Sequence, residues 1–190
     1  MWRPACRELM KTQLSILHCP SDSSVLDLSS DQYQWGGIPV SRTSYKGVIG
    51  DTRMGGSHSP WAGSPDCHRT SRCPGIFWRH SYVYTVSIAD IRDGTSNTLA
   101  IGEDVPEANH HSVAFYANGD YSSTHAPLNY FPDPPTPNHW PSVMSFRSRH
   151  PGGAHFCLAD GSVRFISETI NLELYQALST KDGREPVQVP

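Results

Sequence analysis

The sequence predicts an α+β fold, in which an antiparallel β-sheet domain carries long irregular loops and a short C-terminal helix. Three observations support this class. The 190 residues include 15 glycines and 16 prolines but only 17% charged residues, which is typical of loop-rich β domains and not of helical bundles. Several short segments alternate between apolar and polar residues. An Asp-Gly pair between two apolar runs indicates a hairpin. The length suits a single domain over residues 1–190.

In the first part of the chain, short elements are expected between long irregular stretches. Leu14 and Ile16 predict a short strand that ends before Pro20, because proline removes a backbone donor. Residues 22–75 are rich in Ser, Gly, Pro and Asp, and we expect them to be irregular except for a strand at Ser44–Ile49. A loop of this length is either a functional surface or an insertion without a function.

Two further strands are expected in the middle of the chain. Over Phe77–Ile88 the apolar residues recur with a period of two, which predicts a half-buried strand. Leu99–Glu103 (LAIGE) predicts a second strand after a turn. Residues 104–149 are interpreted as loop, including the stiff proline-rich segment at 132–141.

The clearest local prediction is a hairpin over Ala154–Ser167 (AHFCLADGSVRFIS). A two-residue type I′ turn at Asp160 and Gly161 would place Leu158 opposite Val163 and Phe156 opposite Phe165. All four apolar side chains would then share one buried face. Asn171 is a suitable N-cap for a short helix that follows, and the tail at 181–190 is expected to be frayed.

Charge and hydropathy exclude two classes of partner. The chain has 15 basic and 18 acidic residues and no basic patch, so a nucleic-acid partner is not expected. It has no apolar run of about 18 residues, so we expect no membrane-spanning helix, and its first residues do not resemble a signal peptide.

Five cysteines leave at least one thiol unpaired within the chain. Cys67 and Cys73 bracket a short polar loop, which favours a disulfide in an oxidising compartment. Two alternatives stay open: a metal site that also uses His68, and free thiols.

One loop offers clustered oxygen ligands for a cation. Asp90, Asp93 and Asn97 lie between the two predicted middle strands, and such loops bind Ca²⁺ in extracellular proteins. The same residue types also cap turns without an ion, so Ca²⁺ is the single cofactor that the sequence suggests, and no other is expected.

Three motifs together resemble a known family. They are CPSD at 19–22, SIADIRDGTSNTLAIGE at 87–103 and SRHPGGAHFCLADGSVRFISETIN at 148–171. Their order and spacing resemble the prepilin-type family of unknown function that is named for its His-X9-Asp-Gly processing-associated C-terminal domain. The motif residues that this likeness singles out are His150, Gly152, Gly153, Asp160 and Gly161.

The resemblance implies an architecture and a location more than an activity. Complete members resemble type IV pilins and type II secretion pseudopilins, with a leader, a long apolar helix and then a β-rich part. This chain starts just before CPSD, so we expect the helix to be missing, through a truncated gene model or in a shortened paralogue. The likeness implies exposure at the cell envelope or outside the cell, with other pilin-like or envelope proteins as partners.

The function expected from the sequence is therefore assembly or surface binding without catalysis, and no residue is assigned a catalytic role. His150 and Asp160 are interpreted as structural, although a catalytic pair or a metal ligand is the alternative. A hydrolase using these two residues would need their side chains in contact. A glycan-binding module would need exposed tryptophans along one groove, the candidates being Trp35, Trp61, Trp78 and Trp140.

Overall fold

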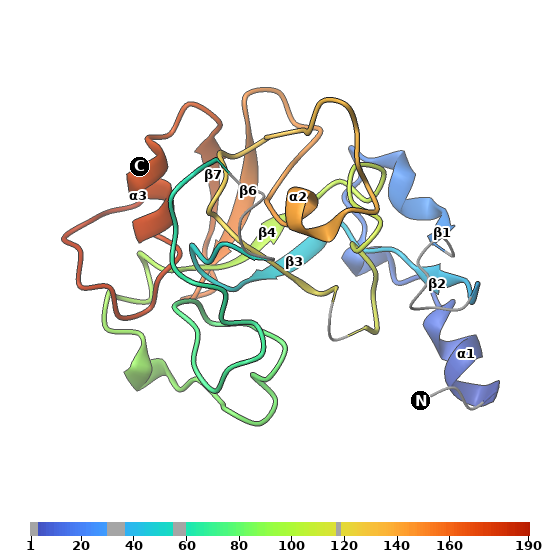
Figure 1. The fold of residues 1–190 in the computed structure, drawn as a ribbon, viewed down its shortest axis with the longest axis horizontal. Coiled ribbons are helices and arrows are strands. Elements are labelled where there is room, and N and C mark those ends of the chain that lie inside the picture. The colour runs from blue at the N-terminus through green and yellow to red at the C-terminus, as the bar shows by residue number, and fades with distance from the viewer. Residues whose placement is uncertain (1–3, 30–36, 55–59, 117–118) are drawn as a thin grey trace.

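A five-stranded β-sheet lies at the centre of the molecule (Figure 1). The structure is a computed structural model that describes residues 4–29, 37–54, 60–116 and 119–190. The strand order is β5-β3-β4-β6-β7, and every neighbouring pair is antiparallel except the parallel pair β3–β5. The strands are β3 (Tyr45–Val48), β4 (Leu99–Glu103), β5 (Tyr121–Ser122), β6 (Gly153–Leu158) and β7 (Val163–Ser167). Together with the three short α-helices found in these ranges, this sheet confirms the predicted α+β class, and β3 and β4 confirm two of the expected strands.

The N-terminal segment forms a separate group of small elements beside the sheet (Figure 1). It contains α1 (Pro4–Met10), η1 (Ser15–Leu17), η2 (Ser23–Leu26) and the two-stranded sheet of β1 (Leu28–Ser29) and β2 (Val40–Ser41). The strand expected at Leu14 and Ile16 is wrong. The amide of Leu17 donates to the carbonyl of Leu14 instead, which closes a 3₁₀ turn and leaves Ile16 exposed.

The strand expected over Phe77–Ile88 is also wrong. Its backbone donors bond locally, since the amides of Ser81 and Val83 reach the carbonyls of Trp78 and His80. These turns use the groups that a strand ladder needs, and the segment continues into η4 (Ile88–Asp90). Trp78 is buried in a cluster that also contains Cys67 and Cys73, and Val86 packs against this cluster while staying partly exposed. The alternation of apolar and polar residues in this segment therefore does not correspond to a strand of the sheet.

The main core lies between one face of the sheet and α3 (Leu172–Ala177). The side chain of Asn171 accepts the amide of Leu174, which confirms the predicted N-cap. Phe156 is fully buried, and its ring packs edge-on against Phe146 at 5.2 Å and Tyr175 at 5.9 Å between centroids. Other members of this core are Val48, Leu99, Leu128, Ala154, Leu158, Ile166 and Leu178.

The β6–β7 hairpin forms, but with a different turn and register from those predicted. The amide of Gly161 donates to Leu158 at 3.0 Å and that of Leu158 donates to Ser162 at 2.8 Å, so three residues form the loop. Gly161 has φ +86° whereas Asp160 is not among the positive-φ residues. These features belong to a type I turn with a glycine bulge, not to a type I′ turn. His155 now pairs with Phe165, and Cys157 with Val163.

This one-residue shift moves half of the expected apolar face to the other side of the sheet. Phe156 and Leu158 are buried as predicted, but Val163 is 58% exposed and Phe165 is 45% exposed. The second side of the sheet, which we call the open face, carries Ile101, His155, Cys157, Val163 and Phe165. Within the described ranges, no helix is both long and apolar enough to cross a membrane.

Candidate functional site

Three side chains from distant parts of the chain meet at one edge of the open face. The Sγ of Cys19 lies 3.6 Å from Oε1 of Glu103 and 3.5 Å from Nε2 of His150. The same Nε2 and Oε1 atoms are 3.2 Å apart. Among the described residues, these three form the one group of His, Cys or acidic side chains whose donor atoms are close enough to hold a single ion.

Each of the three residues is held by its backbone. Glu103 ends β4, and its carbonyl accepts the amide of Arg147 at 2.9 Å. Cys19 follows η1, and its amide donates to the hydroxyl of Ser44 at 3.0 Å. The amide of His150 donates to the hydroxyl of Ser148, also at 3.0 Å. The side chains therefore start from fixed positions, which favours a preformed site.

His155 of β6 holds the second carboxylate oxygen of Glu103. Its backbone amide donates to Oε2 at 2.7 Å, and its Nδ1 lies 3.5 Å from the same oxygen. The rings of His150 and His155 are nearly perpendicular, with 4.8 Å between centroids. Oε2 of Glu103 thus accepts a hydrogen bond from His155, while Oε1 faces the thiol of Cys19 and the imidazole of His150.

The site is a buried carboxylate and thiol with a partly accessible imidazole. Glu103 and Cys19 are buried, whereas the His150 side chain is 24% exposed. Burial raises the pKa of the Cys19 thiol, and the nearby Glu103 carboxylate raises it further. Burial likewise raises the pKa of Tyr45, which pairs with Glu103 across β3 and β4. In the absence of a cation the thiol is therefore kept protonated and is a poor nucleophile.

The geometry differs from that of a Cys-His-acid catalytic triad. In such a triad, one imidazole nitrogen faces the nucleophile and the other faces the acid. Here Nε2 of His150 faces both Cys19 and Glu103. The three donor atoms converge on one point instead of forming a relay.

A cavity of about 420 Å³ opens beside the cluster on the open face. Its lining is mainly apolar apart from the cluster and His155. It consists of Cys19, Pro20, Tyr45, Ile101, Glu103, His150, His155, Phe156, Cys157 and Val163. A small molecule or a partner side chain can therefore approach the three donor atoms from this side.

A network of buried charged side chains lies next to Glu103 in the structure. The next residue, Asp104, is completely buried and accepts hydrogen bonds from Asn109 and Ser112, each at 2.6 Å. It also lies 3.3 Å from Arg147 and 3.6 Å from Lys46, which are equally buried. Burial lowers the pKa of Lys46 to about 8. This network fixes the end of β4 and with it the position of Glu103.

Of the predicted motif residues, His150 contributes its side chain to the cluster, whereas the others shape the backbone and the hairpin turn. Asp160 is not near His150: its carboxylate accepts the amide and the hydroxyl of Ser162 at 2.8 and 2.7 Å. Gly152 has φ +79°, and a side chain at Gly153 would collide with the carbonyl oxygen of Ile166. The side-chain contact that a hydrolase using His150 and Asp160 would need is therefore not formed.

The loop proposed for Ca²⁺ uses its carboxylates within the protein. Asp90 accepts the amide and hydroxyl of Ser87 at 2.8 and 2.7 Å, as in a capping box. Asp93 accepts the amides of Gly183 and Arg184, both at 2.7 Å. The backbone amide of the third predicted ligand, Asn97, donates to the carbonyl of Gly94 and closes a turn. The two carboxylates serve different partners.

The three tryptophans in the described ranges, Trp61, Trp78 and Trp140, do not line a common groove. Trp78 is buried, Trp140 packs against His68 at 5.4 Å between ring centroids, and Trp61 contacts Tyr130 at 4.6 Å in another cleft. Trp35 lies outside the described residues. This arrangement gives the glycan-binding alternative no support from the three described tryptophans.

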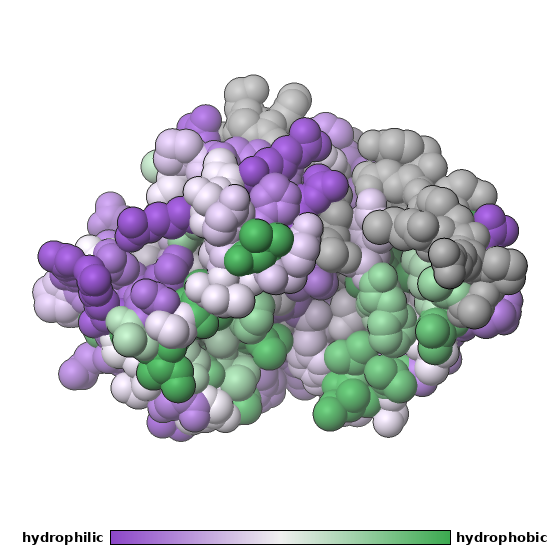
Figure 2. All heavy atoms as spheres, turned by 90° about the horizontal axis from the view of Figure 1, so that it is seen from below, coloured by the Kyte–Doolittle hydropathy of each residue, from purple (hydrophilic) through white to green (hydrophobic). Residues whose placement is uncertain are grey.

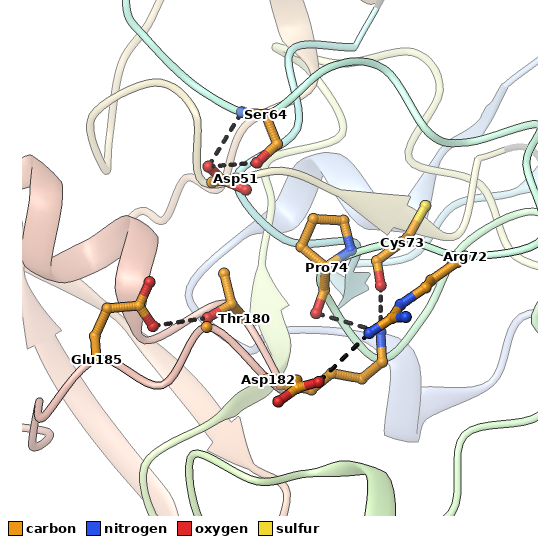
Figure 3. Close-up of a pocket in the computed structure, with 10 residues that line it drawn as sticks. Asp51, Ser64, Arg72, Cys73, Pro74, Thr180, Asp182 and Glu185 are labelled. Carbon is orange, nitrogen blue, oxygen red and sulfur yellow. Dashed lines mark hydrogen bonds and ion pairs between the residues drawn. The ribbon is translucent and has the colours of Figure 1, made fainter.

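In the structure a disulfide bond joins Cys67 and Cys73. A cavity of about 430 Å³ lies next to it (Figure 3). There Asp51 accepts the amide and hydroxyl of Ser64, and Arg72 pairs with Asp182 at 3.4 Å. Its charged side chains bond within the protein, Arg72 to Asp182 and Lys181 to the carbonyls of Cys73 and Gly75, so this cavity is a weaker candidate than the cluster at Cys19.

Sequence reasoning selected His150 but missed its partners, Cys19 and Glu103. A signal for them was present, because Cys19 begins the first motif, Glu103 ends the second and His150 lies in the third. Each motif thus contributes one residue with metal-binding or acid-base chemistry. The fold brings these three residues into contact.

A comparison with models of protein families identifies the family to which the chain belongs. The model described as "Protein of unknown function (DUF1559)" matches residues 1–173, so the chain belongs to this family. Comparisons with curated proteins and with solved structures found no match.

Proposed function

We propose that this family member is the globular part of a pilin-like module exposed at the cell envelope, which acts by protein assembly and not by catalysis. The observation that carries the proposal is the open face of the sheet. The opposite face packs on α3, whereas the open face leaves Ile101, Val163 and Phe165 between 38% and 58% exposed.

An open apolar sheet face favours a binding partner. Burying such side chains stabilises a complex by about 25 cal/mol per Å² of apolar surface. The partner that fits best is an apolar helix, like the one that precedes the β-rich part in pilin-like proteins, since helices commonly cover one face of an antiparallel sheet. The hairpin positions two of these side chains on β7, where the strand lies at the edge of the sheet.

Two further features support envelope exposure and assembly. The disulfide between Cys67 and Cys73 suits an oxidising compartment. Apolar side chains also gather in separate areas of the surface seen from below (Figure 2). Among the described residues of the N-terminal segment, the exposed large apolar side chains are those of Leu9, Leu14, Ile16, Leu26 and Leu28. Exposed apolar patches are typical of interaction surfaces.

Site-specific crosslinking in the native host tests the proposal. A photoreactive amino acid at Val163 should capture pilin-like or other envelope proteins. The same probe at Tyr82, which is 76% exposed but lies outside the sheet, should capture much less. Equal capture from both positions would contradict an assembling role for the open face. A hydrolytic activity that is lost in His150→Ala while the fold is retained would contradict the non-enzymatic part.

The compartment is tested separately by non-reducing peptide mapping. Protein recovered from the host envelope should yield a peptide pair linked through Cys67 and Cys73. Two free thiols in that material would contradict exposure to an oxidising compartment.

A further inference from the structure

We propose that Cys19, Glu103 and His150 bind one Zn²⁺ ion, with a fourth coordination position open to the cavity on the open face. The inference is independent of the assembling role proposed above. It depends on the donor set, on the distances among the three donor atoms and on their support.

The donor set suits zinc. Thiolate, imidazole and carboxylate are the three side-chain ligand types that Zn²⁺ uses, and the ion prefers tetrahedral coordination. Hard ions such as Ca²⁺ and Mg²⁺ prefer oxygen ligands, and only one of the three donors here is oxygen.

The distances match the edges of a zinc tetrahedron. Ligand distances of about 2.3 Å for sulfur, 2.0–2.1 Å for nitrogen and 2.0 Å for oxygen give edges of about 3.5 Å (S–N), 3.5 Å (S–O) and 3.3 Å (N–O) at tetrahedral angles. The corresponding separations in the structure are 3.5, 3.6 and 3.2 Å. The ligands therefore need almost no movement to accept the ion.

Hydrogen bonds between neutral groups would leave the charge of the buried carboxylate without a counter-charge. The thiol of Cys19 and Nε2 of His150 can each donate one proton to Oε1 of Glu103, but neither neutral group carries a positive charge. A cation at the centre contacts all three donor atoms and compensates the buried carboxylate.

The surroundings orient the ligands as in known metal sites. Oε2 of Glu103 accepts the amide of His155, which leaves Oε1 to bind the ion through a single oxygen. Cys19 and His150 are fixed through Ser44 and Ser148. Structural zinc sites are closed by a fourth protein ligand, whereas sites with three protein ligands keep one position for water or another molecule. The cavity lies on this side of the cluster, and the half-exposed ring of His155 stands beside it.

Metal titration of the full chain tests the site. Protein freed of metal and kept under anaerobic conditions should bind one Co²⁺, with the thiolate charge-transfer absorption and strong visible bands of a tetrahedral site, and Zn²⁺ should displace it. Cys19→Ser should abolish the charge-transfer band. Glu103→Gln and His150→Ala should weaken binding by more than the factor of about 10–100 typical for loss of an outer-sphere partner. The matched control is Cys157→Ser, which removes a second free thiol from the same cavity and should leave the spectrum unchanged.

A second measurement avoids variants of the ligands. In a Cys6→Ser, Cys157→Ser background, Cys19 is the one remaining free thiol. One equivalent of Zn²⁺ should slow its alkylation at least tenfold if the thiolate binds the ion. An unchanged alkylation rate, no charge-transfer band in the wild type, or loss of that band in Cys157→Ser would each overturn the proposal. Both readouts use the isolated chain, so they are independent of the crosslinking result.

Discussion

The hairpin register predicts that Phe156→Ala and Phe165→Ala will differ strongly in their effect on stability. The two residues are close in the same hairpin, but they point to opposite faces of the sheet. Phe156 is completely buried, whereas Phe165 is 45% exposed. Since the chemical change is the same, the comparison isolates the effect of the face.

The structure sets the magnitude for each variant. Phe156 packs on Phe146 and Tyr175, and a methyl group at Gly102 would collide with its ring, so the surroundings leave little room to collapse. Truncation to alanine at such a site costs about 3–5 kcal/mol. Complete burial of a Phe side chain is worth about 1.5–3 kcal/mol, so the half-exposed Phe165 should cost about 1 kcal/mol.

Urea titrations followed by fluorescence and far-UV circular dichroism give the two free energies of unfolding. If Phe156→Ala does not fold, Phe156→Leu should still cost more than Phe165→Leu. The m-values should match the wild type, which shows that the same surface is exposed on unfolding. Equal costs for the two alanine variants would refute the register, because the two-residue turn places both rings in the core.

Three other predictions concern pH, the turn and calcium. Burial lowers the pKa of His111 and of His125 to about 4, so folding favours their neutral forms. The free energy of unfolding should therefore be highest above pH 6.5 and should fall by about 3 kcal/mol per histidine between pH 6.5 and 4. Equal urea midpoints at pH 7 and pH 4.5 would contradict this. Gly161→Val should cost about 1–3 kcal/mol and Gly161→Asn clearly less, because φ is +86° there; equal costs in denaturant titrations would argue against the turn. Calcium should leave the melting temperature unchanged, since Asp90 and Asp93 already accept bonds within the protein; a rise that is lost in the Asp90→Ala, Asp93→Ala variant would contradict this.

The hairpin shows which features of the fold a local sequence pattern can predict and which it cannot. Asp160 and Gly161 correctly located the turn, because few residues besides glycine adopt positive φ easily. The same pair is compatible with loops of two or three residues, and tertiary packing decides between them, because Ile166 enters the main core in place of Phe165. Apolar character alone could not place Phe165, since both faces of this sheet carry apolar residues.

The candidate site shows a second limit of sequence reasoning. His150 stood out by its motif, but its partners lie 131 and 47 residues away in the chain. Their contact depends on the antiparallel pairing of β4 with β6 and on the turn that carries Cys19 to the end of β4. Neither follows from local periodicity. The failed strand at Phe77–Ile88 has a related cause, because alternation predicts a strand only where a neighbouring strand is free to pair.

The most direct measurement is anomalous diffraction at the zinc absorption edge from crystals of the wild-type chain grown with one equivalent of Zn²⁺. We predict a single peak that lies about 2.0–2.3 Å from Sγ of Cys19, Oε1 of Glu103 and Nε2 of His150. A map without a peak there, in which these three side chains contact one another directly, would contradict the assignment of the cluster as a metal site.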